Sequence, residues 1–228
     1  MQTAERLSRL AAHVATGLTD GMIVGLGSGS TAEAVVRAIG ERVAGGLAIV
    51  GVPTSENTAR LARSLGIPLR TLDEVEMIDL GIDGADEIAP NLDLVKGAGG
   101  AHLREKLIAL ACRDYLVVAA SEKLVDRLGT RMPLPVEIIP LGARQTMARL
   151  EAVGCRGAIR ERGGAPFVTD NGGWIVDCET GPIDDALALG ARVKAVTGVV
   201  EHGIFTGIAR RATVVHPDGR IETFTRSG

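Results

Sequence analysis

The chain has 228 residues, a formal net charge of -3 and a hydrophobic fraction of 46%. The apolar content is sufficient for a buried core, which excludes a disordered chain, and the slightly acidic balance lacks the basic excess of a nucleic-acid-binding surface. No apolar run reaches the roughly 18 residues that a membrane-spanning helix needs.

The first 19 residues are predicted to form an amphipathic helix. Leu7, Leu10, Ala11 and Val14 recur at helical spacing on one face. Charged residues interrupt the apolar ones, so the segment lacks the continuous apolar stretch of a signal peptide. The three cysteines of the chain are odd in number and widely spaced, which favours reduced thiols over a disulfide framework or a zinc site. We therefore expect a cytoplasmic protein.

Short apolar strands alternate with helices up to about residue 128. The order strand, glycine turn, helix, strand is typical of a parallel α/β sheet, in which ligands bind at the carboxyl ends of the strands. Thr54 or Ser55 can cap one of the helices, and Gly66 can end it. The expected strands are Met22–Leu26, Leu47–Val52, Pro68–Leu72, Met77–Ile82 and Tyr115–Ala119, and the expected helices cover residues 32–39, 55–64 and 101–112.

The pattern changes near residue 129, where a mixed block with antiparallel hairpins is expected. Met132–Val136 contains two prolines, which suits a linker or an edge segment. Asp170–Gly173 carries the Asn-Gly pair of a tight hairpin turn. Further strands are predicted at residues 136–140, 158–160, 167–169, 174–178 and 199–205, helices at 142–153 and 183–194, and a final hairpin at 212–216 and 221–225.

The glycine-rich segment Gly25–Thr31, between a predicted strand and a predicted helix, is the first candidate for chemistry. Free N–H groups at a helix start and the helix dipole favour an anion, and Ser28, Ser30 and Thr31 add hydroxyl groups. The segment lacks the Gly-Lys-Ser/Thr of nucleotide-hydrolysing loops, and Ser30 replaces the third glycine of the dinucleotide fingerprint. The alternative is a tight turn that only connects two elements.

The second candidate is the acidic segment Asp79–Glu87, which follows an apolar lead-in at a strand end. Asp83, Asp86 and Glu87 could perform general acid/base chemistry, bind the hydroxyls of a sugar, or hold Mg²⁺, because hard cations prefer clustered oxygens. The spacing of a calcium-binding loop is absent. The residue types by themselves leave these three interpretations open.

The third candidate, Lys96–Lys106, combines a cation, a glycine loop and a carboxylate in one short segment. Lys96 ends a predicted strand, Gly97–Gly100 form the loop, and Glu105 lies about one turn into the next helix. Glu105 can equally be an ordinary first-turn acid favoured by the helix dipole, and Lys96 an exposed cation. Lys123, which follows another strand, could reach a phosphate group.

In this order and context, the three segments resemble the ribose-5-phosphate isomerase A family, and the similarity runs from about residue 5 to 225. The combination of Asp83–Glu87 with Arg104–Lys106 is the most specific part. The matching stretches are Gly25–Ala32, Asp83–Glu87, Lys96–Gly99, Arg104–Lys106, Pro133–Glu137 and Thr169–Gly172.

The resemblance implies an α/β fold with two domains. A parallel-sheet, Rossmann-like catalytic domain would cover residues 1–128 and 206–228, and a smaller α+β, ferredoxin-like lid and oligomerisation domain would cover 129–205. The family uses no metal and no organic cofactor, and its members are homodimers or homotetramers. A small sugar phosphate would be the binding partner, without nucleic acid or membrane.

The resemblance also implies roles for individual residues. Glu105 would be the catalytic base, assisted by Asp83 and Lys96. Many relatives have glycine at the position of Ala98, and alanine narrows the range of backbone angles available to the loop. Some relatives also carry a lysine in the first helix that this chain lacks. The substrate-binding residues would be Ser28, Gly29, Ser30, Thr31, Asp83, Gly84, Ala85, Asp86, Lys96, Gly97, Ala98, Gly99 and Lys123.

These residue types suit the interconversion of D-ribose 5-phosphate and D-ribulose 5-phosphate, a step of the non-oxidative pentose phosphate pathway. One carboxylate, Glu105, can move a proton between neighbouring carbons through an enediolate, whose charge Lys96 and loop N–H groups can stabilise. Asp83 could assist opening of the sugar ring. Two alternatives are a sugar-phosphate-sensing domain of a regulator and a relative that isomerises or deaminates amino-sugar phosphates.

Overall fold

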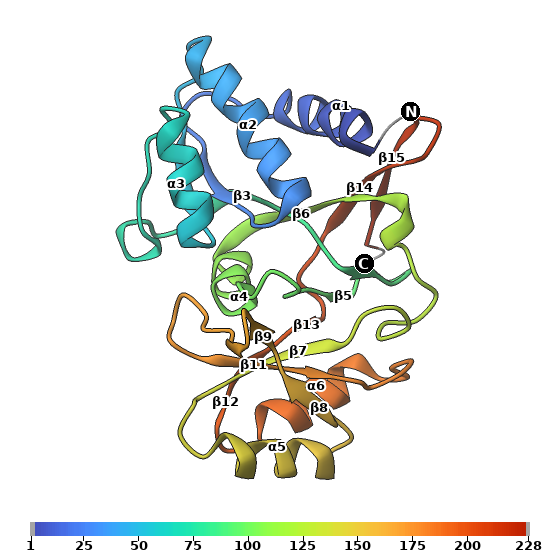
Figure 1. Cartoon of the computed structure of the whole chain (residues 1–228). Coiled ribbons are helices and arrows are strands. Elements are labelled where there is room, and N and C mark those ends of the chain that lie inside the picture. The colour runs from blue at the N-terminus through green and yellow to red at the C-terminus, as the bar shows by residue number, and fades with distance from the viewer. Residues whose placement is uncertain (1–2, 227–228) are drawn as a thin grey trace. The chain divides into compact units, whose positions relative to one another are not determined.

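A computed structural model describes residues 3–226, which form two compact units (Figure 1). The first unit comprises the described residues up to Ala85, together with Arg104–Lys123 and the residues from Gly207 onward. The second comprises Asp86–Leu103 and Leu124–Thr206. Residues 1, 2, 227 and 228 lie outside the described residues. All four belong to the predicted catalytic domain, and residues 1 and 2 also belong to the predicted first helix.

A six-stranded, mostly parallel sheet in the order β15-β14-β6-β3-β1-β2 forms the centre of the first unit. Its strands pair in parallel except for β15, which runs antiparallel to β14 in the predicted C-terminal hairpin. The strands are β1 (Ile23–Leu26), β2 (Val50–Pro53), β3 (Ile78–Asp83), β6 (Cys112–Ala120), β14 (Arg211–Val215) and β15 (Ile221–Thr225).

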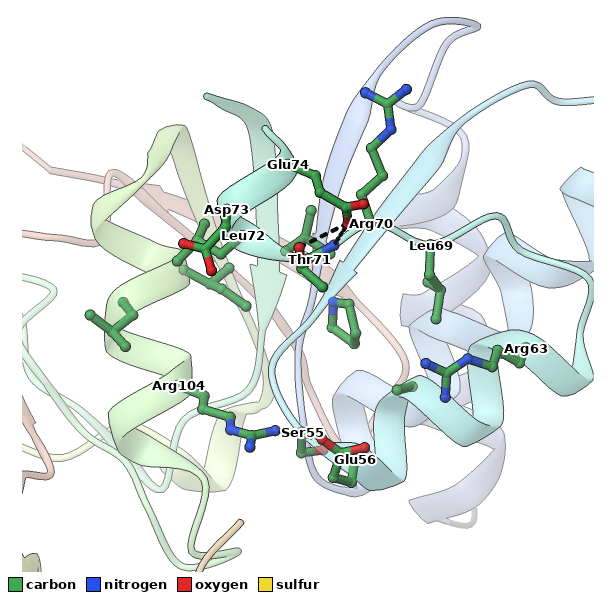
Figure 2. A pocket seen from close by; sticks show the side chains of 15 residues that line it. Ser55, Glu56, Arg63, Leu69, Arg70, Thr71, Leu72, Asp73, Glu74 and Arg104 are labelled. Atoms are coloured by element: carbon green, nitrogen blue, oxygen red, sulfur yellow. Dashed lines mark hydrogen bonds and ion pairs between the residues drawn. The ribbon is translucent and has the colours of Figure 1, made fainter. Parts of the chain in front are cut away.

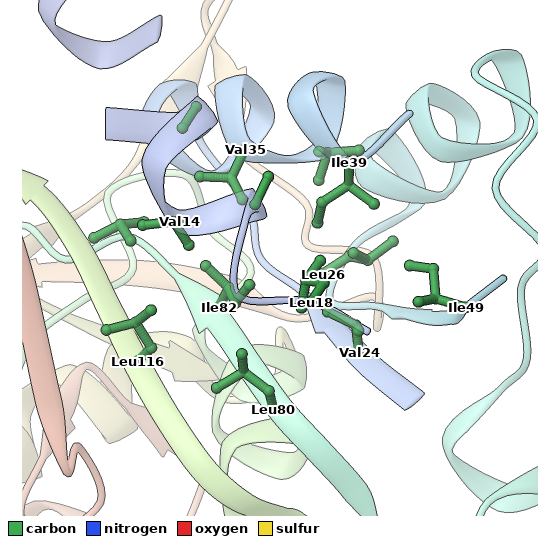
Figure 3. Close-up of a cluster of buried hydrophobic side chains, with 14 of the residues drawn as sticks. Val14, Leu18, Val24, Leu26, Val35, Ile39, Ile49, Leu80, Ile82 and Leu116 are labelled. Atoms are coloured by element: carbon green, nitrogen blue, oxygen red, sulfur yellow. The ribbon is translucent and has the colours of Figure 1, made fainter. Parts of the chain in front are cut away.

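Helices cover both faces of this sheet. Successive residues of a strand point to opposite faces, so each face presents its own set of side chains to the helices. Val24 and Leu26 of β1 pack in the core under α1 and α2 (Figure 3). A Cβ placed on Gly25, between them, would instead contact Ile108 of α4. The unit therefore has the predicted α/β, Rossmann-like architecture. Its helices are α1 (Thr3–Ala15), α2 (Ser30–Ala44), α3 (Glu56–Ser64) and α4 (His102–Leu110).

In the second unit, apart from the hairpin β9-β10 inserted between β8 and β11, the elements follow the order β7-α5-β8-β11-α6-β12, which is the ferredoxin-like βαββαβ order. These strands form an antiparallel sheet in the order β12-β7-β11-β8. A buried cluster that includes Val136, Leu150, Val176 and Val193 joins the sheet to its two helices. The bounds are β7 (Leu134–Ile138), α5 (Ala143–Ala152), β8 (Gly157–Ile159), β11 (Trp174–Cys178), α6 (Ala186–Lys194) and β12 (Val199–His202).

Two smaller sheets complete the second unit. One has three strands in the order β13-β5-β4. This pairing explains why residues 86–103 belong to the second unit, whereas the sequence had suggested the first: β5 pairs with β13, which lies about a hundred residues later in the chain. The bounds are β4 (Glu87–Ile88), β5 (Leu94–Val95), β13 (Ile204–Phe205), and the hairpin strands β9 (Glu161–Arg162) and β10 (Ala165–Pro166).

The proline-rich segment Met132–Val136 was expected to be a linker or an edge segment, and this is wrong for most of its length. Strand β7 begins at Leu134 and lies inside its sheet, between β12 and β11. Pro135 is tolerated there because the register with β12 extends only to Val136, so no ladder N–H is required of the proline. Its carbonyl still accepts a hydrogen bond of 2.8 Å from the N–H of Gly203.

Three other segments differ from expectation. Phe167–Thr169 is not a strand, because Val168 makes only a single bridge to Trp174. Pro68–Leu72 is not a strand: Leu69 makes a single bridge to Gly51, and the 3₁₀ helix η1 begins at Leu72. The predicted strand at 199–205 divides at Gly203 into β12 and β13, which belong to different sheets.

Within residues 3–226, no helix combines the length and apolar character needed to cross a membrane. All three cysteines are free thiols, with Cys155 and Cys178 buried and Cys112 partly buried. Burial, reinforced by the charges of Asp83 and Asp114, raises the pKa of Cys112 to about 12. This thiol therefore stays protonated near neutral pH.

Candidate active site

The segment Gly25–Thr31 connects β1 to α2, as predicted, and presents the start of a 15-residue helix. Gly29 occupies the N-cap position with φ of 88°, a left-handed conformation that favours glycine, and no side chain caps the helix. Ser30 and Thr31 form the first turn, with Ser30 exposed. Uncapped N–H groups and the helix dipole make this turn suitable for a phosphate group.

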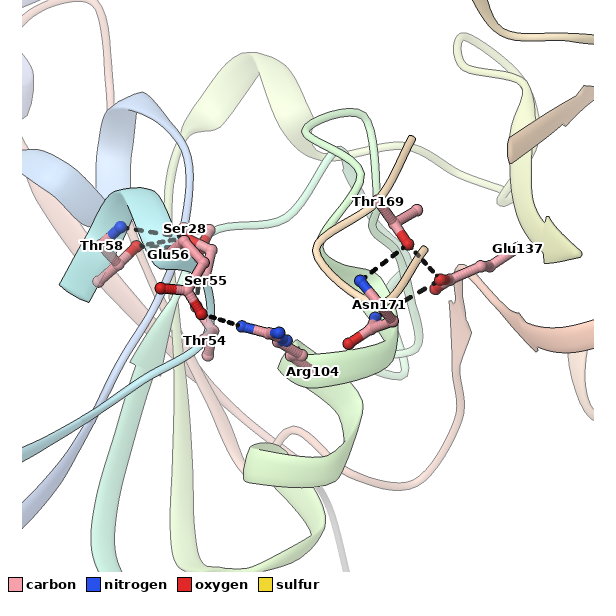
Figure 4. Close-up of polar contacts among 9 residues, drawn as sticks. All are labelled: Ser28, Thr54, Ser55, Glu56, Thr58, Arg104, Glu137, Thr169 and Asn171. Atoms are coloured by element: carbon pink, nitrogen blue, oxygen red, sulfur yellow. Dashed lines mark hydrogen bonds and ion pairs between the residues drawn. The ribbon is translucent and has the colours of Figure 1, made fainter. Parts of the chain in front are cut away.

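Ser28 faces the interior of the first unit rather than the start of the helix. Its N–H donates to Oδ1 of Asp83 at 3.0 Å. Its hydroxyl lies 2.8 Å from the hydroxyls of Thr54 and Ser55 and 3.1 Å from that of Thr58 (Figure 4). Ser55 also caps α3, as the sequence suggested, by accepting the N–H of Thr58. The hydroxyl cluster therefore ties the glycine loop to α3.

Asp83, at the end of β3, is 1% exposed and directly contacts this loop. Its Oδ1 also accepts the N–H of Gly84 at 2.7 Å, and its Oδ2 accepts the hydroxyl of Tyr115 at 3.3 Å. Burial and the charges of Asp83 and Glu105 raise the pKa of Tyr115 well above its usual value, so the hydroxyl remains a donor. A side chain at Gly27 would collide with Asp83, which explains the glycine.

Glu105 lies in the first turn of α4 and is only 5% exposed. An ordinary first-turn acid is solvated, so burial argues against that simpler interpretation. The neighbouring residue Arg104 donates to Glu56 at 2.8 Å, which connects α4 to the first residue of α3.

A cavity of about 530 Å³ lies beside this ion pair in the first unit (Figure 2). Arg104 and Glu56 line one side of it, and the turn Thr71–Glu74 lines the other. Glu105 and Ser28–Thr31 are not among its lining residues, so the cavity is not lined by these candidate catalytic and substrate-binding side chains.

In the second unit, Lys96 follows β5 and is 2% exposed. Its ammonium group lies 5.6 Å from the centre of the Phe205 ring, a favourable cation–π distance. Its N–H donates to the carbonyl of Gly203 at 2.9 Å. The interpretation of Lys96 as a solvated surface cation is therefore wrong.

The loop after Lys96 uses some of its own polar groups for structure. The N–H of Ala98 donates to Oδ2 of Asp86 at 2.9 Å, and the N–H of Gly100 donates to the carbonyl of Gly97 at 2.9 Å. Gly97 and Gly100 have positive φ angles of 107° and 84°, whereas Ala98 does not, so alanine fits without strain. Among the described residues, the fold provides no acceptor for the N–H groups of Gly97 and Gly99.

Arg160 holds the other side of this loop, and the sequence analysis did not select it. Its Nη1 donates to the carbonyls of Gly97 at 3.1 Å and Ala98 at 2.9 Å. Its Nε and Nη2 bind the carboxylate of Asp177 at 2.8 and 2.5 Å. No local pattern indicates this contact, because Arg160 is more than 60 residues from the loop in the sequence.

Glu87, which the sequence grouped with the acidic cluster, is a structural residue in the second unit. It is fully buried and accepts the backbone N–H groups of Gly129, Arg131 and Met132 at 2.5, 2.6 and 3.0 Å. Its carboxylate therefore fixes the turn that leads into β7.

Lys123 ends the 3₁₀ helix η2 (Ser121–Lys123) and is partly exposed. Beside it, Glu122 pairs at 2.9 Å with Arg6 of α1, whose side chain is 8% exposed. In the first helix, where some relatives carry a lysine, Ser8 and Arg9 are both exposed. Arg6 is thus a buried cation of this helix, and it lies one turn before Leu10 on the same buried face. Among the described residues, no group of three or more His, Cys, Asp and Glu side chains could hold a metal ion.

Residues 50–219 match the family described as Ribose 5-phosphate isomerase A (phosphoriboisomerase A). A ribose-5-phosphate isomerase A from Synechococcus sp. is 48% identical over 100% of both chains, and one from Roseiflexus sp. is 50% identical over 94% of this chain and 93% of the relative. The chain belongs to the ribose 5-phosphate isomerase A family.

Solved structures agree with this assignment. Ribose 5-phosphate isomerase from Plasmodium falciparum superposes with a TM-score of 0.95 at 37% identity, covering 99% of this chain and 100% of that one. A D-ribose-5-phosphate isomerase in complex with phospho-erythronic acid has a TM-score of 0.95 at 36% identity and the same coverage.

Proposed function

We propose that this protein interconverts D-ribose 5-phosphate and D-ribulose 5-phosphate through an enediolate. Full-length similarity to ribose-5-phosphate isomerases A, at 48% identity over both complete chains, is the observation that carries this conclusion. Neither a sugar-phosphate sensor nor an amino-sugar-phosphate enzyme is favoured by the relatives.

Glu105 is proposed to move the proton. Its carboxylate takes a proton from C2 of the open-chain aldose and returns it to C1. The hydroxyl on C2 loses its proton and the carbonyl oxygen on C1 gains one, which gives the ketose. The support is its burial in the first turn of α4, because a carboxylate shielded from water is a stronger base toward carbon than a solvated one.

The negative charge that develops on the enediolate oxygens needs donors. We assign this role to the ammonium group of Lys96 and to two N–H groups of the loop. These are the N–H groups of Gly97 and Gly99, for which the described residues provide no acceptor. The N–H of Ala98 is bound to Asp86, so it is not assigned to the substrate. Asp83 is proposed to assist ring opening.

The phosphate group of the substrate is assigned to the start of α2. Ser30 and Thr31 lie in its uncapped first turn, and Lys123 is proposed as a further cation. The inward bonds of Ser28 suggest that it supports this turn and contacts substrate less directly than the sequence implied.

The solved relative bound to phospho-erythronic acid fits this scheme chemically. Such an acid pairs a phosphate with a carboxylate, whose two charged oxygens resemble the two oxygens of an enediolate. A ligand of this kind should therefore bind more tightly than the substrate to an enzyme of this mechanism.

The proposed function is tested by measuring ribulose 5-phosphate formation from ribose 5-phosphate, with glucosamine 6-phosphate as the competing substrate. Turnover of the pentose phosphate alone supports the proposal. Binding of either sugar without turnover would indicate a sensor, and turnover of the amino sugar alone would indicate the other enzyme class. We also propose a homodimer or homotetramer in the cytoplasm, which light scattering of the purified protein and cell fractionation would test.

A further inference from the structure

We propose that Arg160 is a positioning residue that aims the N–H of Gly99 at the developing negative charge of the substrate. The proposal rests on the isomerase function proposed above, and it concerns residues of the second unit only. Arg160 itself is not assigned a contact with substrate.

The guanidinium of Arg160 is held in one orientation. Nε and Nη2 form a two-pronged ion pair with the two carboxylate oxygens of Asp177, and the side chains are only 16% and 28% exposed. Such a fork fixes the plane of the guanidinium as well as its position. The remaining nitrogen, Nη1, therefore points in a defined direction.

Nη1 is directed at two consecutive carbonyls of the loop, those of Gly97 and Ala98. A trans peptide is planar, with the C=O and the N–H of the following residue pointing in opposite directions. Holding the Gly97 carbonyl thus directs the N–H of Ala98 away from Arg160, and this N–H reaches Asp86. One peptide plane is fixed from both sides.

The same geometry governs the next peptide plane. Because Arg160 holds the carbonyl of Ala98, the N–H of Gly99 must point away from the guanidinium. A Cβ placed on Gly99 would have nothing within 4 Å, so the space around this glycine does not restrain it. Arg160 is therefore the contact that selects one direction for a donor on an otherwise adaptable glycine.

Lysine cannot replace this arrangement. An ammonium group could bind either Asp177 or one carbonyl, but it lacks the rigid fork that binds the carboxylate while a third nitrogen bridges two carbonyls. We therefore expect Arg160→Lys to preserve the charge and still lose most of the positioning.

The test compares Arg160→Lys and Arg160→Met with Arg162→Met. Arg162 is a matched control because its exposed guanidinium also lies over the ring of Phe167, at 4.6 Å, compared with 5.9 Å for Arg160. For each variant, kcat and KM for ribose 5-phosphate and the inhibition constants of 4-phosphoerythronate and inorganic phosphate are measured. Circular dichroism establishes that each variant is folded, and Arg160→Lys carries the test if the methionine variant is not.

Both Arg160 variants should lose on the order of 10-fold or more in kcat, with KM changed less than about threefold, because the donor acts on charge that develops after binding. The affinity for 4-phosphoerythronate should fall by about the same factor as kcat/KM, whereas that for phosphate and the activity of Arg162→Met should not change. An unchanged 4-phosphoerythronate affinity, or a rise in KM alone, overturns the proposal. A parent protein without activity on ribose 5-phosphate would instead overturn the proposed function.

Discussion

Replacing Glu87 by glutamine should destabilise the second unit substantially while leaving its side-chain volume unchanged. In the native protein Oε1 accepts the N–H groups of Arg131 and Met132, and Oε2 accepts that of Gly129. Glutamine can present an oxygen to only one of these two positions. The best orientation keeps the oxygen near Arg131 and Met132, so the new NH₂ group faces the N–H of Gly129.

The magnitude follows from these three contacts. A buried N–H that loses its acceptor costs about 1–3 kcal/mol, and two bonds that lose the carboxylate charge weaken by roughly 1 kcal/mol each. The neutral amide is cheaper to bury than a carboxylate, which offsets part of this loss. We therefore expect a net destabilisation of about 2–4 kcal/mol.

The measurement is a urea titration followed by tryptophan fluorescence. The chain has one tryptophan, Trp174, and it lies in β11 of the same unit as Glu87. With an m-value of about 1–3 kcal/mol/M, the midpoint should fall by about 1 M or more. The control Glu161→Gln, at an exposed position of β9, should remain within about 0.5 kcal/mol of the parent. If Glu87→Gln unfolds at the same urea concentration as this control, the three hydrogen bonds do not stabilise the unit as argued.

Four further results are expected. Glu105→Gln should fold but lose about 10²–10⁴-fold in kcat, and exchange of the substrate C2 hydrogen with deuterium, followed by NMR, should slow equally; exchange at the parent rate would make Asp83 the leading candidate for the base. Lys96→Ala should lower kcat by on the order of 10²-fold with little change in KM, whereas a rise in KM alone would make Lys96 a phosphate ligand. Dialysis against a chelator should leave the rate unchanged, and a loss restored by Mg²⁺ or Mn²⁺ would contradict the roles given to Asp83 and Asp86. Because its pKa is raised to about 12, Cys112 of the folded protein should resist alkylation at about pH 9, as mass spectrometry of the modified peptides would reveal.

Several features of the protein could be predicted from local sequence because they depend on neighbouring residues. Glycine and hydroxyl residues between an apolar strand and a helix predicted the turn at Gly25–Thr31, and Ser55 was identified as a possible cap of α3. The Asn-Gly pair predicted the turn at Asp170–Gly173, where the N–H of Thr169 does donate to the carbonyl of Gly173. The order of strands and helices likewise indicated the α/β class.

Spacing could not separate candidate catalytic acids from structural ones, because the hydrogen-bond partners of a side chain depend on what packs around it. Glu105 and Glu87 are both acids close to glycine-rich turns, yet Glu87 accepts three backbone N–H groups of a turn more than 40 residues away. Pro135 looked like a sign of an edge segment until the register of β12 showed that no N–H is needed there.

The sequence by itself determined the family, the α/β class and the segments that carry the candidate chemistry, because motif order, hydrophobic period and turn residues are properties of short stretches. Tertiary structure alone decided which way the polar groups of those segments point. Ser28 faces a hydroxyl cluster about 30 residues away, and the loop after Lys96 is held by Arg160. Hydrogen bonds of this kind join distant segments, and their direction is set by packing that no local pattern encodes.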